Sequence, residues 1–386
     1  MIRRNYRYIL ASMLLPVVLL LSALVTPAQS NNPVPLTNQE FVSMLQQLPA
    51  HPEKRGDLIE AIRTRGLGFP LTNGLRSLVA TKSGNDAALR RTMEEAERRR
   101  LNPQSAVLPP ETEAADLLER TRVATLAAVE RMPDFLVKQQ ITRSQAFGNT
   151  SNWNVYDRLS IAVSYRASSG EQYKLLTVNG MQPDVEVREG STYSGKIKGT
   201  TSTGEYVSIL AGIFDPARQA KFKLVDTDRL RDRPTLVYEY EIKRENSTQT
   251  IKYGDIEAAV ITGYHGRLWV DREKNRVLRL EDISSEIPVN FPVTAATSTI
   301  DYDWVTINEQ QHLLPSRTIV ELTSHEGSGI YQTRNDILFK GYRKFGSELR
   351  ILDVDDKDFI DDDEPGKTPP VKPGSPAPAK PPQAKP

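Results

Sequence analysis

From Phe135 onward the sequence alternates between apolar and polar residues with a period of two, and this alternation constrains the fold more than any other feature. It is clearest in Leu159–Tyr165 and Leu236–Ile242. Because successive side chains of a strand point to opposite faces, each such run predicts a strand. Further strand-like runs are Gln172–Asn179, Lys221–Leu224, Ile256–Thr262, Gly266–Asp271, Arg276–Ile283, Thr297–Ile307, Arg317–Ser324, Tyr331–Phe345 and Leu349–Val354. So many strands with few helices between them predict a large, meandering antiparallel sheet.

The segment Ile261–Ile283 predicts a hairpin in the middle of this sheet. Two strand-like runs flank the four polar residues Arg272–Asn275, a length that suits a type I turn closed by Asn275 in the left-handed conformation. In the first strand, Leu268 points to one face of the sheet and Trp269 to the other. The face that carries Trp269 must therefore be partly covered too.

Two amphipathic segments are available to cover the apolar face of the sheet. Glu113–Met132 repeats apolar residues at helical spacing and ends before Pro133. A shorter helix is predicted from about Gly204 to Phe214, with Leu210 and Phe214 on one side. The predicted fold class is therefore α+β.

Leu36–Arg100 predicts a small all-α module ahead of the sheet. Thr37–Glu40 forms a capping box at the start of its first helix, and later helices begin at Asp57 and cover Asn85–Arg100. Helices this short should pack together. The arginines of the last helix leave a DNA-reading helix-turn-helix open as an alternative, but the interleaved glutamates favour a solvated helix face.

The first thirty residues predict a secretory signal peptide. Arg3, Arg4 and Arg7 precede the apolar run Ile9–Val25, and small residues follow where cleavage would occur. An uncleaved signal anchor is the alternative, because the apolar run is at the lower limit for spanning a bilayer. We therefore expect an exported protein of the periplasm or cell envelope of a bacterium.

Composition narrows the function further. The chain has no cysteine, which excludes disulfides, thiolate metal sites and a lipid-modified cysteine. The formal net charge of +1 includes Arg3, Arg4 and Arg7 of the signal and the lysines at 367, 372, 380 and 385 of the tail. Without these residues the folded portion has a net charge of about −6, which makes it a poor nucleic-acid binder. The expected domains are the signal peptide 1–30, the helical module 31–105, the sheet domain 111–355, and a disordered tail 356–386, acidic and then rich in proline and lysine.

The sequence contains no signature of catalysis. Its four histidines lack metal-ligand spacing, and it has no nucleophile elbow, P-loop or dinucleotide fingerprint. Asp301 and Asp303 share a face of one strand, but one polar and one apolar face explain them more simply than acid–base chemistry does. We expect no enzyme and no catalytic, cofactor or metal site. An enzyme assembled from distant residues is the alternative.

Parts of the sequence resemble two known groups of proteins. The hairpin GRLWVDREKNRVLRLE, after a long helix, resembles the outer-membrane lipoprotein carrier and sorting protein superfamily. Closer likeness to uncharacterised exported envelope proteins of acidobacterial type rests on MPDFLVKQQITR, STGEYVSILAGIFDPARQAKF, IPVNFPVTAATSTIDYDWV and HLLPSRTIVEL. The resemblance implies a curved half-barrel that closes over helices and holds acyl chains. IRTRGLGFPLT followed by GNDAALRRTMEEA resembles a small bacterial helical module thought to act in protein contacts.

These observations lead to two hypotheses. In the first, the protein is a carrier-like envelope protein that binds a lipid or acylated ligand, with its lining drawn from Phe135, Trp153, Leu210, Phe214 and Trp269. In the second, the sheet is filled with side chains and the protein is a scaffold that binds an envelope protein through the helical module. The position of Trp269 distinguishes the two hypotheses. A Trp269 side chain that faces a cavity would favour a carrier, and one that is enclosed by packed side chains would favour a scaffold.

Overall fold

The computed structural model describes residues 33–84, 86–148, 150, 152–183, 200–201, 206, 208–253, 259–327, 329–346, 351, 354–356 and 359. The predicted signal peptide and the proline- and lysine-rich tail lie outside these residues. The chain divides into two compact units, Met1–Val34 and Pro35–Pro386. Every element described below belongs to the second unit.

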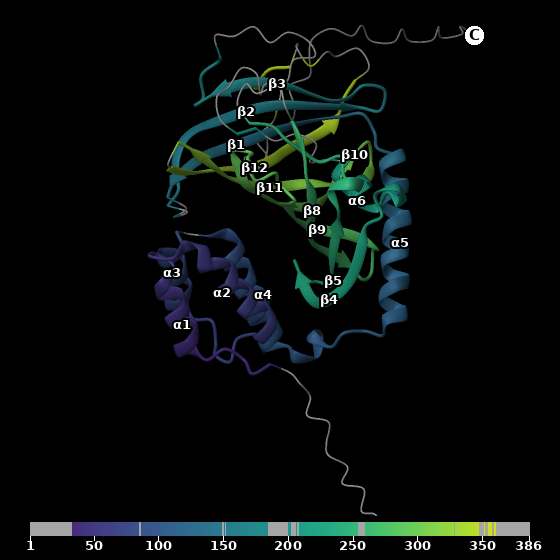
Figure 1. Cartoon of the computed structure of the whole chain (residues 1–386). Helices are drawn as coiled ribbons and strands as arrows, with labels where there is room; N and C mark the ends of the chain where they lie inside the picture. The colour runs from purple at the N-terminus through teal and green to yellow at the C-terminus, as the bar shows by residue number, and fades with distance from the viewer. Residues whose placement is uncertain are drawn as a thin grey trace, which may run out of the picture. The chain divides into compact units, whose positions relative to one another are not determined.

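Short helices form the first part of this unit (Figure 1). They are α1 (Asn38–Gln47), η1 (Pro52–Lys54), α2 (Arg55–Arg65), α3 (Asn73–Lys82), α4 (Ala87–Leu101), η2 (Pro103–Ala106) and the long α5 (Glu111–Glu130). Thr37 and Glu40 make both hydrogen bonds of the predicted capping box at the start of α1. Helices α1 to α4 share a core of their own that includes Phe41, Ile62 and Leu89.

Ten strands form one antiparallel sheet in the order β3-β2-β1-β12-β11-β10-β9-β8-β5-β4. The strands are β1 (Phe135–Phe147), β2 (Asn154–Arg166), β3 (Gly170–Val178), β4 (Lys221–Leu230), β5 (Arg233–Ile242), β8 (Gly263–Asp271), β9 (Arg276–Ser285), β10 (Val293–Ile307), β11 (Gln310–Glu326) and β12 (Gly329–Lys344). Its two edge strands do not pair with each other, so the sheet is open, as in a half-barrel. The predicted α+β fold with a large antiparallel sheet is confirmed.

Smaller elements connect the strands. They are α6 (Ser208–Phe214), η4 (Pro216–Arg218), η5 (Arg244–Asn246), and the two-stranded sheet of β6 (Thr250–Ile251) and β7 (Val260–Ile261). Helix α6 is the described part of the helix predicted over Gly204–Phe214. The strand predicted over Leu349–Val354 falls mostly outside the described residues.

The predicted hairpin is β8–β9, with β5 and β10 as its outer neighbours. Asn275 closes its turn with a φ of 53°, the left-handed conformation that the turn type requires. Gly266 lies opposite Asp282, at a point where the two strands approach very closely. A Cβ atom at Gly266 would overlap the carbonyl oxygen and carbon of Glu281. The pairing at the centre of the sheet therefore requires glycine here.

We predict that Gly266→Ala lowers the free energy of unfolding by about 2–4 kcal/mol, because backbone atoms rather than a side-chain tip must move. Gly56→Ala is the control, since nothing lies within 4 Å of the added carbon in α2. It should leave stability unchanged or slightly higher. Urea denaturation of the two variants measures the difference, and equal midpoints would contradict the close approach.

Candidate functional site

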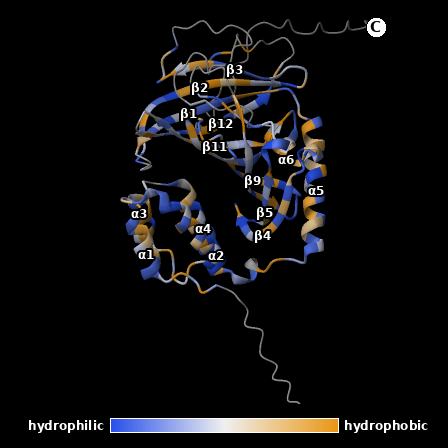
Figure 2. Ribbon diagram, viewed as in Figure 1, coloured by the Kyte–Doolittle hydropathy of each residue, from blue (hydrophilic) through white to orange (hydrophobic). Residues whose placement is uncertain are grey.

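One side of the ten-stranded sheet, called here the apolar face, carries Leu268 and Ile337 among its buried residues and is covered by α5 and α6. Figure 2 shows hydrophobic and hydrophilic residues alternating along the strands and along α5. Two buried clusters lie on this face. The first joins the helices to β5, β8, β9 and β10, and the second joins β1, β2, β3, β11 and β12 to Tyr206 and the end of α5.

Helix α5 meets the apolar face with small residues at several positions. Ala114, Leu117, Thr121 and Thr125 are its buried residues. The Thr121 hydroxyl donates to the Leu117 carbonyl of the same helix, 2.8 Å away, instead of bonding to the sheet. The hydroxyl of Tyr238 donates to the Ala114 carbonyl oxygen at 2.7 Å, a direct bond from sheet to helix. Threonine and alanine bury little apolar area at these positions, while Leu117, Leu118 and Leu126 of the same helix pack on the first cluster.

Aromatic rings fill the end of the apolar face near β1. Phe135 stacks on Tyr165 with ring centroids 5.3 Å apart and packs against Tyr206 at 5.4 Å. Tyr206 in turn meets Phe339 edge-on at 5.3 Å. Such tilted and edge-on pairs are the favoured arrangements of aromatic rings. Phe135 is thus the centre of an aromatic cluster under the segment that precedes α6.

The five residues predicted to line a ligand site fall on both faces of the sheet. Leu210 and Phe214 belong to the first cluster of the apolar face, and Phe135 belongs to the second. Trp269 lies on the opposite face, in a small cluster with Leu230, Val237 and Leu278. Trp153 lies beneath the Arg334 guanidinium, 5.8 Å from its ring centroid. The structure therefore brings three of the five to one face and separates the two tryptophans from them.

Trp269 is only 1% exposed and is enclosed by polar partners. Its indole Nε1 donates to Asp228 Oδ2 at 3.0 Å, and the Arg279 guanidinium lies 5.8 Å from its ring centroid. Asp228 also accepts from Arg98 of α4 at 3.1 Å. The helical module therefore provides the cover that the sequence required for this face.

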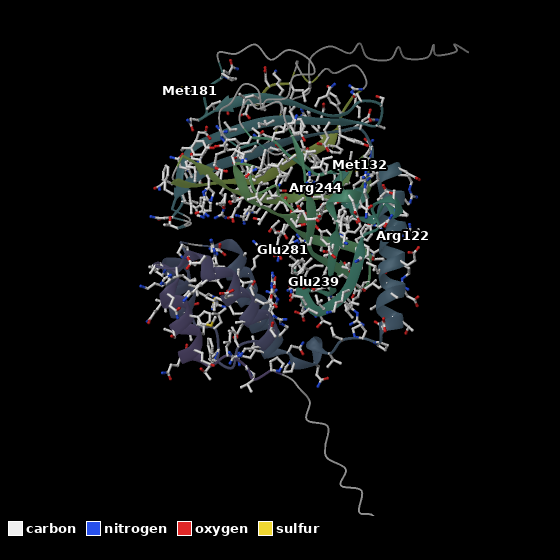
Figure 3. The ribbon with its side chains drawn as sticks, in the orientation of Figure 1. Arg122, Met132, Met181, Glu239, Arg244 and Glu281 are labelled. Atoms are coloured by element: carbon white, nitrogen blue, oxygen red, sulfur yellow. The ribbon has the colours of Figure 1, made fainter. Side chains whose placement is uncertain are left out.

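The face opposite the apolar face, called here the ionic face, meets the module through a network of charges. Glu281 of β9, labelled in Figure 3, lies beside the helical module. It accepts from Arg63 of α2 at 2.9 Å and from Arg91 of α4 at 3.3 Å. Arg99 of α4 pairs with Asp226 of β4. Several of these side chains are mostly buried, so water screens the pairs weakly.

This network corrects the expectation that the arginines of α4 form a solvated face. Arg91 and Arg99 have side chains only 19% and 15% exposed, and both bind sheet carboxylates. The sequence predicted a solvent-exposed face because glutamates within the same helix are close enough in the chain to pair with these arginines. The signal that was missed lies in the strands, where Trp269 shares its face with charged neighbours.

Glu95 of α4 lies in the middle of the ionic face. Burial raises the pKa of its carboxyl to about 7, and the carboxylates of Asp228 and Glu281 add to the shift. Arg279, with a nitrogen 3.6 Å from the carboxyl, and Arg63 oppose it. Glu95 therefore exchanges a proton near neutral pH inside the contact between module and sheet.

Among the described residues, no group of three or more histidine, cysteine, aspartate or glutamate side chains is arranged to hold a metal ion. Of the helices in the described part of the chain, none combines the length and the apolar character that crossing a membrane needs.

We predict that stability falls as the pH rises from about 5 to 8, because the folded state holds the Glu95 proton more tightly than the unfolded state does. Glu95→Gln should remove the part of the pH dependence of stability that comes from this carboxyl. The variant should match the wild type near pH 5 and exceed it by on the order of 2 kcal/mol at pH 8. Thermal or urea unfolding across this range measures it. Glu94→Gln, on the more exposed side of α4, is the control, and a Glu95→Gln effect that did not vary with pH would contradict the assignment.

No protein-family model matches the chain, and no curated protein matches it significantly. Among solved structures, it is similar to a putative outer-membrane lipoprotein-sorting protein domain from Vibrio parahaemolyticus, at 10% identity and a TM-score of 0.26, covering 60% of this chain and 93% of that chain. It is also similar to a DUF1329 family protein from Desulfovibrio piger, at 11% identity and a TM-score of 0.28, covering 59% and 94%. A third is the Pseudomonas aeruginosa MucA/MucB complex, at 11% identity and a TM-score of 0.19, covering 58% and 94%.

Proposed function

We propose that this is an exported, non-enzymatic cell-envelope protein that binds a hydrophobic ligand, a lipid or an acyl chain, on the apolar face beneath α5 and α6. The observation that carries the proposal is the difference between the floor of this site and its cover. A continuous ten-stranded sheet forms its floor, whereas one long helix and the seven-residue α6 form its cover. A floor held by ladders of hydrogen bonds stays fixed while such a cover moves.

The contacts of α5 support its role as the movable part. Its buried side includes Thr121 and Thr125, which bury less apolar surface than leucines would. Its first turn is tied to the hairpin by the ion pair of Glu113 with Arg272, 2.5 Å apart and largely exposed. Exposed ion pairs contribute at most about 1 kcal/mol. An acyl chain gains about 0.8 kcal/mol for each methylene it buries, which is enough to displace contacts of this strength.

The chemistry of the floor supports an apolar ligand. Its side chains come from β1, β5, β8, β9, β10 and β12 and are mainly leucine, isoleucine, valine and aromatic residues. Phe135, Leu210 and Phe214 remain our candidates for the lining. The export of the protein rests on Arg3, Arg4, Arg7 and the apolar run that follows them.

We predict that holding α5 to the sheet blocks exchange of the ligand. The chain has no cysteine, so Glu113→Cys with Arg272→Cys can be joined by a bis-maleimide. Release of a bound fluorescent fatty acid should slow at least about tenfold after cross-linking, because α5 can no longer move away from the sheet. Stopped-flow displacement by unlabelled fatty acid measures the rate.

The matched control joins Arg76→Cys to Glu94→Cys, which replaces an ion pair between α3 and α4 inside the module. Its release rate should not change. Two results would contradict the proposal: a fatty acid that does not bind the intact protein, and equal release rates in the two cross-linked proteins.

A second candidate function, an interaction scaffold, is favoured by the enclosure of Trp269 between module and sheet. Because Trp269 lies on the ionic face, its enclosure does not decide whether the apolar face binds a ligand. The contacts of α2 and α4 with the ionic face would hold the module in a fixed position. Helices α1 and α3 would then present the same surface to a protein partner in the envelope. Deleting the module is a poor test, since deletion would expose Trp269 and the carboxylates of the ionic face.

Exposed positions on the module offer a cleaner test. We predict that Gln46→Arg on α1 combined with Ser77→Arg on α3 removes the proteins labelled by a proximity enzyme fused to the chain, because added charge opposes docking at an interface. Glu130→Arg at the end of α5 is the control. An unchanged set of labelled neighbours in the Gln46 and Ser77 variant would argue against the scaffold.

A further inference from the structure

Charged side chains, and no shared apolar core, join the helical module (α1 to α4) to the ionic face. The buried cluster of the module is built from residues between Leu36 and Ala96, whereas the cluster around Trp269 is built from strand residues. Among the described residues, no buried apolar cluster has members from both the module and the sheet. The module can therefore leave the sheet without losing its own core.

Glu95 of α4 is poorly paired at this contact. Its Oε1 has no hydrogen-bond partner among the described residues, and the Arg279 nitrogen that faces it is 3.6 Å away. The arginines around it are already bound to other carboxylates: Arg63 to Glu281 at 2.9 Å, Arg98 to Asp228 at 3.1 Å and Arg279 to Asp301 at 2.7 Å. An ionised Glu95 would therefore be a buried charge without a counter-charge of its own, which is costly.

The charged groups that face Glu95 come from three elements packed against α4. They are Arg63 of α2, Asp228 of β4, and Arg279 and Glu281 of β9. Burial, and then the two carboxylates, raise the pKa of Glu95 to about 7. After release of the module the carboxyl returns to water and to its usual pKa. The docked state therefore holds the proton more tightly, and docking weakens as the pH rises through about 7.

The other carboxyls of the ionic face do not cancel this effect. Burial raises the pKa of Asp226 and of Glu321, so both act in the same direction as Glu95 does. Burial would also raise the pKa of Glu281, but Arg63 and Arg91 lower it below its usual value. Glu281 therefore keeps its charge between pH 6 and pH 8 and contributes no change in that range.

The connection to the rest of the chain allows the module to move. Only η2 and residues 107–110 lie between α4 and α5 (Figure 1). Val107 and Leu108 of this connection are 65% and 47% exposed, so their side chains do not anchor it to the sheet. A tether this short keeps a released module close to the ionic face, and docking again is an intramolecular step.

We propose that docking of the helical module on the ionic face is reversible and controlled by one proton: the module stays docked while Glu95 is neutral and is released, still folded, when Glu95 ionises. Release uncovers Trp269 and the carboxylates of the ionic face. Helices α1 and α3 then have a fixed position only below neutral pH. The inference is independent of whether the apolar face binds a ligand.

A single thiol reports the release, because the chain has no cysteine of its own. Thr299 of β10 is half-buried and accepts a hydrogen bond from Arg91 of α4 at 3.0 Å. In Thr299→Cys, a polyethylene-glycol maleimide is too bulky to reach the thiol until α4 moves away. Dividing its labelling rate by that of the exposed Ser77→Cys at the same pH removes the titration of the thiol itself.

This relative rate should rise about tenfold between pH 6 and pH 8, as expected for a carboxyl whose pKa is about 7 when docked and normal when released. Adding Glu95→Gln should remove most of the rise, whereas adding Glu94→Gln should leave it unchanged. Thr318→Cys is the matched control, a threonine 1% exposed on the apolar face of the neighbouring strand. At pH 8 it should label at least about tenfold more slowly than Thr299→Cys, because release of the module does not uncover it.

Three results would overturn the proposal. The first is an equal relative rate for Thr299→Cys at pH 6 and pH 8. The second is a tenfold rise that persists with Glu95→Gln. The third is equal labelling of Thr299→Cys and Thr318→Cys at pH 8, since the reagent would then reach both thiols through unfolding and not through release of the folded module.

Discussion

The two faces of the ten-stranded sheet have opposite chemistry, and every helix of the described structure that packs on the sheet does so by satisfying one of them. Strand alternation places Leu268 and Leu280 on one side and Trp269, Arg279 and Glu281 on the other. The apolar side excludes water with α5 and α6. The ionic side needs counter-charges, which α2 and α4 supply. A shift of one residue in the register of β8 or β9 would exchange the two chemistries and leave both sets of helices without a matching surface.

The ionic face determines where the module sits more than how strongly it is held. Removing charges such as Glu281 from water is expensive, and the attraction to Arg63 and Arg91 offsets that cost without a large surplus. Misplaced docking would leave buried charges unpaired, and that error costs several kcal/mol. The hydrophobic contribution at this contact comes from the small cluster around Trp269, while the module keeps its own core.

Much of the fold could be predicted from the sequence because its signals are local. The period of two, the capping box at Thr37 and the left-handed Asn275 each depend on residues close together in the chain. The partners of the two faces could not be predicted in this way. Arg63 and Glu281 are 218 positions apart, and nothing local distinguishes an arginine that binds a distant carboxylate from one that faces solvent. Trp269 was predicted to have a covered face, but the identity of its cover depended on the same long-range pairing.

The pairing of β1 with β12 has a consequence for how this chain is made. The sheet order joins an early block, β1 to β3, to a late block, β4 to β11, and β12 is the strand that joins them. Contacts this distant in sequence form slowly. Until β12 arrives, each block exposes half of an apolar surface to water, with the seam between them at Ile141, Ile337 and Thr318. A chain that crosses a membrane from its N-terminus would therefore be most exposed to aggregation just before its last strand emerges, and would depend on protection by chaperones at that stage.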